Sequence, residues 1–444
     1  MFVAIRKMNF NINQLLDKGI YLKQKKQLQE ATDAFEFALK IDPQCSSAYQ
    51  QLGDICWSQG KLVKAILYYE KAVEIEPNNG ILLYNMAEIY KKQERLEQAA
   101  KHYIKALQVE PFNNSPFIQL MYMKLIPTQL DELVVFYQQL SQSKPNNPWV
   151  NVKLGNVFTK QGKIKKAISS YQIATYKMTK KFNPEYVAKY WEQAKPASPK
   201  FIIIGPMKTA TSALYKYINQ HPLVLPCIEK EVHFFNDRYK FSQGKNWYKA
   251  HFPLIPPEES FITGEASPGY IVNNVQDKVF QMFPKIKAIA LIRNPVARAL
   301  SHYHHNVKHG FERRTFQEAI SAELEVIKSF NNPREVLQIR NWRGNTGYVL
   351  IGFYYYFLKQ WLDVFPQEQF LIVNNQDLLV NPESSMKQVF EFLGLDNYTA
   401  QEYPKYYSNS YDPIDENIRL ELADVFRPHN QKLEQLLQCE LNWN

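Results

Sequence analysis

The hydrophobic and polar positions of the chain follow two patterns, which change over near residue 198. In the first 180 residues, apolar positions recur with helical spacing, and small residues, aromatics and prolines return every 34 residues. From Lys200 onward, short apolar runs alternate with helical stretches, which is typical of a parallel α/β sheet. We therefore predict a helical array at 1–181, a linker or capping helix at 182–198 and a second domain at 199–444.

Three kinds of residue define the 34-residue repeat. The recurring positions are Gly19, Gly53, Ala87 and Gly155; Ala31, Ala65, Ala99 and Ala167; Ala38, Ala72, Ala106 and Ala174; Phe35, Tyr69, Tyr103, Tyr137 and Tyr171; and Pro43, Pro77, Pro111 and Pro145. Small residues let two helices approach closely, an aromatic fills the gap between neighbouring hairpins, and proline ends the second helix. This register resembles the tetratricopeptide (TPR) repeat over residues 12–180, as five units of which the fourth is degenerate.

The resemblance to TPR proteins implies an α-solenoid without chemistry of its own. Such arrays usually present a concave groove that binds a peptide or another protein, so we expect a protein partner there. The alternative is a structural spacer or a device for self-association.

In the second region, the segment FIIIGPMKTATSAL at 201–214 joins an apolar strand to a helix through a turn of small residues. The apolar run 201–204 suits a buried strand, while Leu214, Tyr217 and Ile218 mark the inward face of the helix. A helix that starts in such a turn presents unpaired N–H groups and the positive end of its dipole. The segment therefore predicts an anion site.

Lys208 lies three residues after Gly205, whereas the nucleotide kinase motif has its lysine directly after the second glycine. The pattern G-x-x-K-x-small-[ST]-[ST] instead resembles the 5′-phosphosulfate loop of sulfotransferases that use 3′-phosphoadenosine 5′-phosphosulfate (PAPS). The resemblance implies that this co-substrate, with no metal, is bound by Gly205, Pro206, Lys208, Thr209, Ala210, Thr211 and Ser212. Ala210 stands where these enzymes commonly have glycine, and a positive φ there would strain alanine.

Charged residues beside two phenylalanines follow at 229–237, EKEVHFFND. This segment resembles the K-E-x-H-F-F motif of the heparan sulfate and related carbohydrate sulfotransferases, in which the glutamate is the catalytic base. The resemblance assigns catalysis to Glu231, Lys208 and His233, and it places Lys230 near the acceptor. A surface charge cluster at the end of a strand is the alternative.

The chemistry of sulfuryl transfer explains why a carboxylate is needed. A substrate hydroxyl must lose its proton as the S–O bond forms, and a positioned carboxylate can take it. We expect partial desolvation against Phe234 and Phe235 to raise the basicity of Glu231.

A second apolar run, 288–292, ends at Arg293 and precedes Pro295, which suits the first turn of a helix. Ligands of open α/β sheets bind at the carboxyl ends of strands, so Arg293 and Lys208 should share one crevice. The R-N-P-x-x-R-x-x-S spacing resembles the 3′-phosphate-binding segment of sulfotransferases. It implies that Arg293 and Ser301 bind the 3′-phosphate, while Arg298 is as readily structural.

Other segments carry less specific signals. The turn 264–270 is interpreted as positional, and three histidines, His302, His304 and His305, as solvated or packed rather than as zinc ligands. The segment 343–348 resembles a family segment near the acceptor, and 370–377 resembles one at the far edge of the sheet. Residues 406–414 lie where the carbohydrate enzymes have a basic, glycine-containing loop over the nucleotide, but this stretch has neither glycine nor arginine. The candidates there are Gly347 and Tyr348 for substrate binding, and Ser408, Ser410 and Tyr411 for closure over the nucleotide.

The formal net charge of +10 is concentrated in the first region. Residues 1–198 hold 27 Lys and Arg against 17 Asp and Glu, whereas residues 199–444 hold 26 of each. Residues 151–198 alone hold 10 basic and 2 acidic side chains. Such a strip suits an acidic partner or a polyanionic substrate, although a solvated helix face is the simpler alternative. No nucleic-acid motif accompanies it, so we expect no nucleic-acid partner.

Four cysteines without metal spacing fit a reducing compartment. The sequence has no apolar run of eighteen residues and no signal-peptide pattern, so we expect a cytoplasmic protein without a membrane span.

These observations predict an enzyme that transfers a sulfuryl group from PAPS to a hydroxyl or amine of a saccharide or peptide acceptor. The fold class would be a TPR α-solenoid followed by a P-loop-like, three-layer α/β domain with a parallel sheet. One alternative is a non-catalytic TPR scaffold whose α/β domain binds a nucleotide. A P-loop kinase is disfavoured by the position of Lys208 and by the lack of a magnesium-binding segment.

Overall fold

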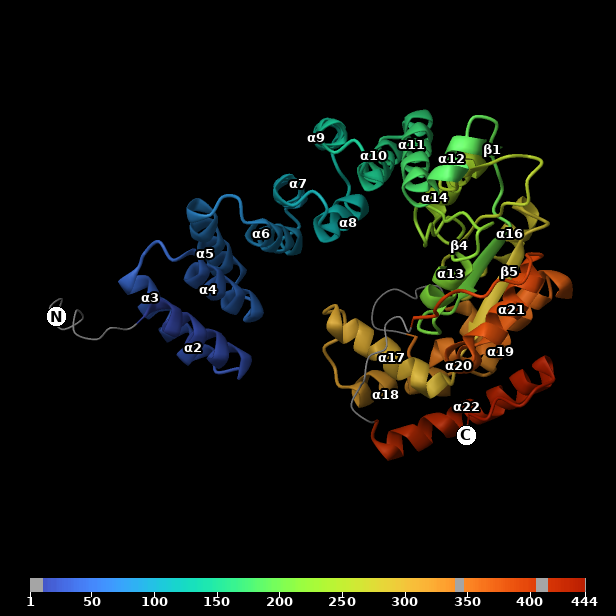
Figure 1. The fold of residues 1–444 in the computed structure, drawn as a ribbon. Helices are drawn as coiled ribbons and strands as arrows, with labels where there is room; N and C mark the ends of the chain where they lie inside the picture. The colour runs from blue at the N-terminus through green and yellow to red at the C-terminus, as the bar shows by residue number, and fades with distance from the viewer. Residues whose placement is uncertain (1–10, 340–346, 405–413, 444) are drawn as a thin grey trace. The chain divides into compact units, whose positions relative to one another are not determined.

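The computed structural model describes residues 11–339, 347–404 and 414–443. The chain divides into two compact units, one of residues 1–145 with 156–163 and the other of 146–155 with 164–444 (Figure 1). The predicted fold class, a helical array followed by an α/β domain with a parallel sheet, is confirmed. The predicted domain boundaries at 181 and 198 stay predictions. Within the described residues, no helix is long and apolar enough to cross a membrane.

Successive helix pairs correspond to the five predicted repeats. They are α2 (Ile12–Gln24) and α3 (Leu28–Ile41), α4 (Ser46–Ser58) and α5 (Leu62–Ile75), α6 (Gly80–Lys92) and α7 (Leu96–Val109), α8 (Asn114–Tyr122) and α9 (Pro127–Ser143), and α10 (Pro148–Lys160) and α11 (Ile164–Phe182). The first helix of the fourth pair has only 9 residues, which is where the sequence repeat is degenerate.

The repeat has glycine at positions 19 and 53 because an aromatic ring lies against the backbone and leaves no space for a side chain. A Cβ placed on Gly19 would lie 2.5 Å from Cε1 of Phe35, and one on Gly53 would lie 2.8 Å from Cε1 of Tyr69. Both aromatic side chains have 0% of their surface exposed. In these two hairpins, therefore, the small residue of the first helix packs against the aromatic of the second, so the aromatic fills space within its own hairpin, whereas the periodicity predicts it between neighbouring hairpins.

The second unit is organised around a four-stranded parallel sheet in the order β4, β2, β5, β6. The strands are β2 (Phe201–Gly205), β4 (Gly264–Ala266), β5 (Lys287–Ile292) and β6 (Phe370–Asn374). All five residues of β2 are buried, which means that both faces of the sheet are covered. Because β4 and β5 lie on opposite sides of β2, the strand order reverses at β2 and β5, and their carboxyl ends form a switch point.

Helices and short strands surround this sheet. They are α12 (Pro184–Tyr190), α13 (Thr211–Ile218), α14 (Arg238–Ser242), α15 (Gly244–Lys249), α16 (Gln276–Met282), α17 (Pro295–Lys308), α18 (Phe316–Lys328), α19 (Tyr354–Leu362), α20 (Asn375–Val380), α21 (Pro382–Leu393) and α22 (Glu416–Leu437), with 3-10 turns at Pro333–Gln338, Leu350–Gly352 and Gln367–Gln369. Two short strands, β1 (Lys195–Pro196) and β3 (Leu254–Ile255), pair antiparallel.

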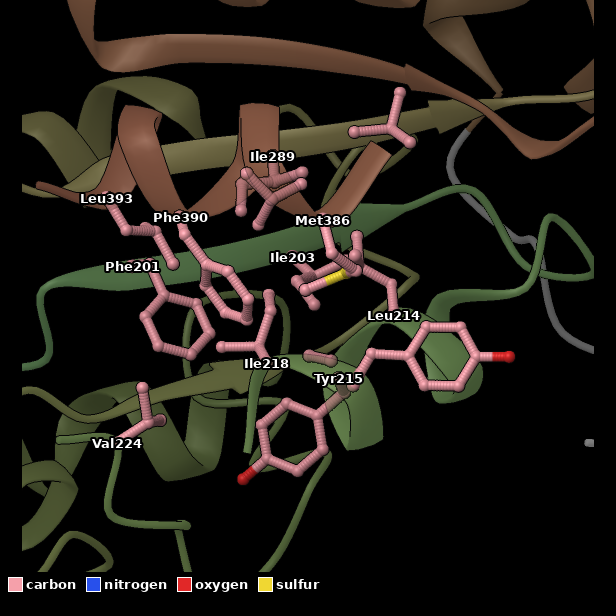
Figure 2. Packing of buried hydrophobic residues seen from close by; sticks show 14 of the residues in the cluster. Phe201, Ile203, Leu214, Tyr215, Ile218, Val224, Ile289, Met386, Phe390 and Leu393 are labelled. Atoms are coloured by element: carbon pink, nitrogen blue, oxygen red, sulfur yellow. The ribbon is translucent and has the colours of Figure 1, made fainter. Parts of the chain in front are cut away.

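The main core lies between one face of the sheet and the helices α13 and α21 (Figure 2). As predicted, Leu214, Tyr217 and Ile218 of α13 face inward. The core includes Phe201, Ile203, Leu214, Ile218, Ile289, Met386, Phe390 and Leu393. This packing fixes the start of α13 directly behind the end of β2, where the predicted anion site lies.

Candidate active site

The loop between β2 and α13 has an unusual backbone. Gly205 has φ +106°, and a Cβ on it would lie 2.1 Å from the carbonyl oxygen of Pro268, so only glycine fits. Lys208 has φ 69° and Ala210 has φ 74°. Ala210 is therefore in the left-handed region, which costs on the order of 1 kcal/mol for a non-glycine residue. The strain anticipated for alanine at this position is present.

Hydrogen bonds hold the loop from inside. The Thr209 hydroxyl donates to the carbonyl oxygen of Pro206 at 2.7 Å, and Thr209 has no exposed surface. The Asn375 side-chain amide donates to the carbonyl oxygen of Thr209 at 3.1 Å. Thr211 is buried as well, whereas Ser212 is partly exposed at the start of α13. Asn375 supports the loop from the end of β6, a role that nothing in its sequence context indicates.

Arg293 and Lys208 lie side by side. The Arg293 guanidinium donates from Nη1 to the carbonyl oxygen of Lys208 at 3.0 Å, which joins the ends of β5 and β2. Ser301, also predicted to bind the nucleotide, is buried on α17 with 6% of its surface exposed. The structure thus brings two cationic side chains to the switch point of the sheet, together with the positive end of α13.

Glu231 lies between two donors of its own segment. Lys230 Nζ is 2.6 Å from one carboxylate oxygen, and His233 Nε2 is 3.2 Å from the other. Burial alone would raise the pKa of Glu231, but the bonds from His233 and Lys230 outweigh it and lower the pKa to about 2. The expectation of raised basicity is therefore wrong. Phe234 and Phe235 are buried, and their rings stack on or pack against that of Tyr248 inside the domain.

A buried carboxylate that the sequence did not single out, Glu265 of β4, positions this segment. It accepts hydrogen bonds from four groups: the Val232 amide at 3.0 Å, the Ser267 hydroxyl at 2.6 Å, and the hydroxyls of Tyr248 at 2.6 Å and Tyr270 at 2.8 Å.

Two of these four donors also accept hydrogen bonds from the neighbouring backbone. The His233 amide donates to the Ser267 hydroxyl, and the Phe234 amide donates to the Tyr270 hydroxyl. The positional interpretation of the turn 264–270 agrees with these contacts, and Glu265 is the residue through which the turn acts.

Two of the three histidines on α17 lie near the charged groups. Partial desolvation and the Lys208 charge lower the pKa of His305, and the Glu231 charge partly opposes them. Burial and Arg298 lower the pKa of His302 to about 3, and that side chain is packed inside, as expected. His305 is exposed, and its place near Lys208 and Glu231 was missed. His305 lies four residues after Ser301 on α17, so the two side chains share one face of the helix, and this spacing could have indicated its position.

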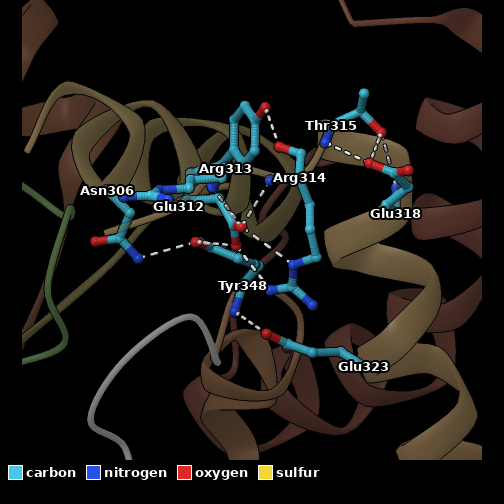
Figure 3. Close-up of polar contacts among 9 residues, drawn as sticks. Asn306, Glu312, Arg313, Arg314, Thr315, Glu318, Glu323 and Tyr348 are labelled. Carbon is cyan, nitrogen blue, oxygen red and sulfur yellow. Dashed lines mark hydrogen bonds and ion pairs between the residues drawn. The ribbon is translucent and has the colours of Figure 1, made fainter. Parts of the chain in front are cut away.

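Buried polar contacts hold the segment that begins at Gly347, and those of Tyr348 with Glu312 and Glu323 are drawn in Figure 3. The buried Arg298 donates from Nη2 to the carbonyl oxygens of Gly347 at 2.8 Å and Tyr348 at 2.5 Å. Glu323 accepts from the Tyr348 amide at 2.7 Å, and the Tyr348 hydroxyl contacts Glu312 at 3.1 Å. Arg298 is thus structural.

The side chain of Tyr348 is fully buried and supports this segment from behind. Substrate binding by Gly347 and Tyr348 stays a prediction. The closure candidates Ser408, Ser410 and Tyr411 lie outside the described residues.

Comparisons with known proteins agree with both halves of the chain. A family model described as "Sulfotransferase domain" matches residues 198–421, and one described as "Tetratricopeptide repeat" matches residues 46–79 and 81–113. The human "Bifunctional heparan sulfate N-deacetylase/N-sulfotransferase 2" is 30% identical over 281 residues, covering 56% of this chain and 30% of that protein.

Two further relatives are informative. The "Heparan sulfate glucosamine 3-O-sulfotransferase 5" of Mus musculus is 31% identical over 271 residues, covering 55% of this chain and 74% of that protein. A solved sulfotransferase from Alicyclobacillus acidocaldarius is 26% identical with a TM-score of 0.45, covering 56% of this chain and 99% of that one. The chain thus spans under a third of the bifunctional relative and about three quarters of the 3-O-sulfotransferase.

Proposed function

The chain belongs to the sulfotransferase family, as its motifs predicted, and from this premise we propose that it transfers a sulfuryl group from PAPS to an acceptor hydroxyl or amine. The enzyme class predicted from the sequence, a PAPS-dependent sulfotransferase, is that of its family. The observation that carries the proposal is the contact between Arg293 and Lys208 at the carboxyl ends of β5 and β2, with the Glu231 segment bound to the end of the neighbouring strand β4 by the hydrogen bond from the Ala266 amide to the Lys230 carbonyl.

The residues at the switch point fit the anionic groups of PAPS. Gly205, whose Cβ position is filled by the Pro268 carbonyl, allows the tight turn at the end of β2, and the start of α13 behind that turn would offer backbone N–H groups to a ligand. Lys208 would meet the 5′-phosphosulfate at the start of α13. Arg293, with its planar fork of donors, and Ser301 would bind the 3′-phosphate.

Glu231 would act on the acceptor. The acceptor oxygen or nitrogen forms a bond to sulfur, the bond between sulfur and the 5′-phosphate oxygen breaks with its electron pair going to that oxygen, and the acceptor proton passes to Glu231. Lys208 and the loop amides would stabilise the charge that develops on the phosphate oxygen. When bound, PAPS supplies the sulfuryl group and the leaving group.

The bond from Lys230 to Glu231 adds a condition to this mechanism. A carboxylate with a pKa of about 2 is a weak proton acceptor at neutral pH. Acceptor binding would therefore have to draw His233 and Lys230 away from the carboxylate, which would restore basicity to Glu231. An acceptor that carries its own carboxylate or sulfate groups could do so.

The acceptor follows from the relatives only as a proposal. The names of two relatives describe sulfation of heparan sulfate, so we propose a saccharide amine or hydroxyl as the acceptor. A peptide acceptor held by the TPR groove is the alternative, as is a protein partner in that groove.

Nucleotide binding provides the first test. We expect 3′-phosphoadenosine 5′-phosphate (PAP) to raise the melting temperature more than AMP does, because only PAP carries the group that Arg293 and Ser301 would bind. Arg293→Ala should remove most of the difference. Equal shifts for PAP and AMP would contradict the 3′-phosphate assignment.

Turnover provides the second test. The protein would be incubated with ³⁵S-labelled PAPS and either N-desulfated heparan sulfate or a tyrosine-containing peptide. We expect label in the polysaccharide, and Glu231→Gln should lower kcat about a hundredfold while PAP binding stays intact. Label in the peptide alone would show that the acceptor is a peptide rather than a saccharide. PAP binding without label in either would favour the non-catalytic scaffold.

A further inference from the structure

The last helix pair of the array, α10 and α11, is packed on the α/β domain. Residues 146–155 and 164–182 belong to the same compact unit as that domain. The Tyr171 ring, which repeats the aromatic position of every earlier hairpin, lies 5.6 Å from the ring of Trp247 and 4.1 Å from that of His251, centroid to centroid. Tyr171 has no exposed surface. In this hairpin, therefore, the aromatic of the repeat also forms part of the domain core.

His251 links that core to the segment that carries Glu231. Its Nδ1 is 3.0 Å from the Trp247 carbonyl oxygen, and since a carbonyl can only accept, Nδ1 carries the proton. Its Nε2 is therefore a lone-pair acceptor, 3.7 Å from a carboxylate oxygen of Glu229. The backbone carbonyl of His251 accepts from the Ile228 amide at 3.0 Å. The backbone of His251 thus holds Ile228, three residues before Glu231, while its Nε2, which has no hydrogen-bond partner within the described residues, faces the Glu229 carboxyl without bonding to it.

Lys153 of α10 adds a charge at the same place. Only 6% of its surface is exposed, so its ammonium group has lost most of its hydration. Burial lowers the pKa of Lys153 to about 8, and the nearby Glu229 carboxylate partly opposes that fall. Burial in turn raises the pKa of Glu229, against the charges of Lys240, His233 and Lys153. Each of these charges thus favours the ionised form of the other, and a buried cation without such a counter-charge is costly.

We propose that the last repeat is a working part of the catalytic unit: Tyr171 and Lys153 position His251 and Glu229, and through them the catalytic segment around Glu231. Lys153, Tyr171 and His251 are positioning residues, since they act through Glu229 rather than on the substrate. The proposal rests on the proposed function of Glu231. It predicts that a change at Lys153 or Glu229 alters turnover without altering nucleotide binding, since Lys208 and Arg293 lie on other segments.

The test is a double-mutant cycle in the full-length protein. Lys153→Met, Glu229→Gln and the double variant are assayed for kcat and KM with ³⁵S-labelled PAPS and N-desulfated heparan sulfate, and for PAP affinity. We expect each single change to lower kcat about tenfold at unchanged PAP affinity, and the double variant to lose no more than Glu229→Gln alone. Lys153→Arg should restore most of the rate because it retains the charge.

Lys177 provides a matched control on the same hairpin. Its ammonium group donates to the Asn151 side-chain oxygen at 2.7 Å, which joins α11 to α10. Lys177→Met should lower the melting temperature but leave kcat unchanged. An equal loss of kcat in this variant would mean that any weakening of the hairpin suffices, and it would overturn a specific role for Lys153.

The remaining outcomes separate the two proposals. Unchanged kcat in Lys153→Met, or fully additive losses in the double variant, would overturn the positioning role. If Lys153→Met does not fold, the proposal is tested with Glu229→Gln and Lys153→Arg instead. Normal kcat in Glu229→Gln would overturn it. Normal turnover in Glu231→Gln would contradict the proposed function instead, whatever the hairpin variants do.

Discussion

The helical array and the α/β domain are stabilised in different ways. In the array, the same contact between a small residue and an aromatic ring returns in successive hairpins. The hydrogen bonds that accompany it join residues close in sequence, as between the Tyr69 hydroxyl and Asp54 at 2.5 Å. In the domain, single buried carboxylates collect donors from segments far apart in sequence. Glu265 accepts hydrogen bonds from the Val232 amide and the Tyr248 hydroxyl of two other segments and from two hydroxyls of its own turn, and Glu323 accepts from three consecutive amides.

This difference affects what a substitution should do. A solenoid is stabilised by near-neighbour contacts, so the loss of one contact is felt locally. A buried carboxylate with four donors leaves all of them unsatisfied when it is removed. We therefore expect the array to tolerate single polar changes, and the domain to lose stability and geometry together.

The largest expected effect comes from where the chain is cut. A fragment of residues 146–444 retains the complete second unit and should fold and bind PAP. A fragment of residues 183–444 lacks Tyr171 and would expose Trp247 and His251, which are 1% and 0% exposed in the full chain. It should lose cooperative unfolding or aggregate, as thermal melts and size-exclusion chromatography would reveal. Similar melting temperatures for both fragments would mean that the hairpin belongs with the array.

Lys208→Met should have the next largest effect, on rate alone. The loss of a preorganised cation at the leaving group should lower kcat about a thousandfold, at the upper end for one electrostatic contact. The melting temperature should change little because the side chain is partly exposed. Lys216→Met, an exposed lysine on the same helix α13, is the control and should leave kcat unchanged. A normal rate for Lys208→Met would remove the loop from the mechanism.

Glu265→Gln should lower stability by about 2–3 kcal/mol, because an amide group replaces a carboxylate oxygen that accepts two of the four hydrogen bonds. Chemical denaturation would measure the change. Glu231→Gln, in the neighbouring segment, is the control: its side chain is 41% exposed, so solvent screens its ion pairs and stability should fall less than in Glu265→Gln while kcat falls. If the two variants unfold alike, the buried carboxylate has no special structural role.

The smallest effect tests the array. Tyr69→Phe removes the hydroxyl that donates to Asp54 and should cost about 1 kcal/mol of unfolding free energy, with kcat unchanged. Tyr137→Phe is the matched control at the equivalent position of the fourth repeat. Its buried hydroxyl has no hydrogen-bond partner within the described residues, so its removal should be neutral or stabilising. Equal losses in the two variants would contradict this distinction.

Features that depend on local spacing could be predicted from the sequence. The period of 34 residues located all five hairpins, and the strand, turn and helix around Lys208 and Arg293 lie as expected. Even the strain at Ala210 could be anticipated, because it concerns a single backbone conformation.

Features that depend on contacts between distant segments could not be predicted. Glu265 and Asn375 have no distinctive sequence context, and their partners are set by the packing of the sheet. The pKa of Glu231 was misjudged because the rotamers of its neighbours Lys230 and His233 decide it, rather than the two phenylalanines. The double role of Tyr171 was hidden for a related reason, since a periodic residue gives no sign that it also contacts another domain.

The pairing of Lys230 with Glu231 has a consequence for the idle enzyme. Under the proposed function, a bound donor would wait beside a carboxylate whose proton affinity is suppressed by its neighbours. Water entering the cleft would then meet no effective base, and the activated sulfate would be protected from hydrolysis. The ion pair with Lys230, which lowers the basicity of Glu231, would thus keep the enzyme inactive until an acceptor binds.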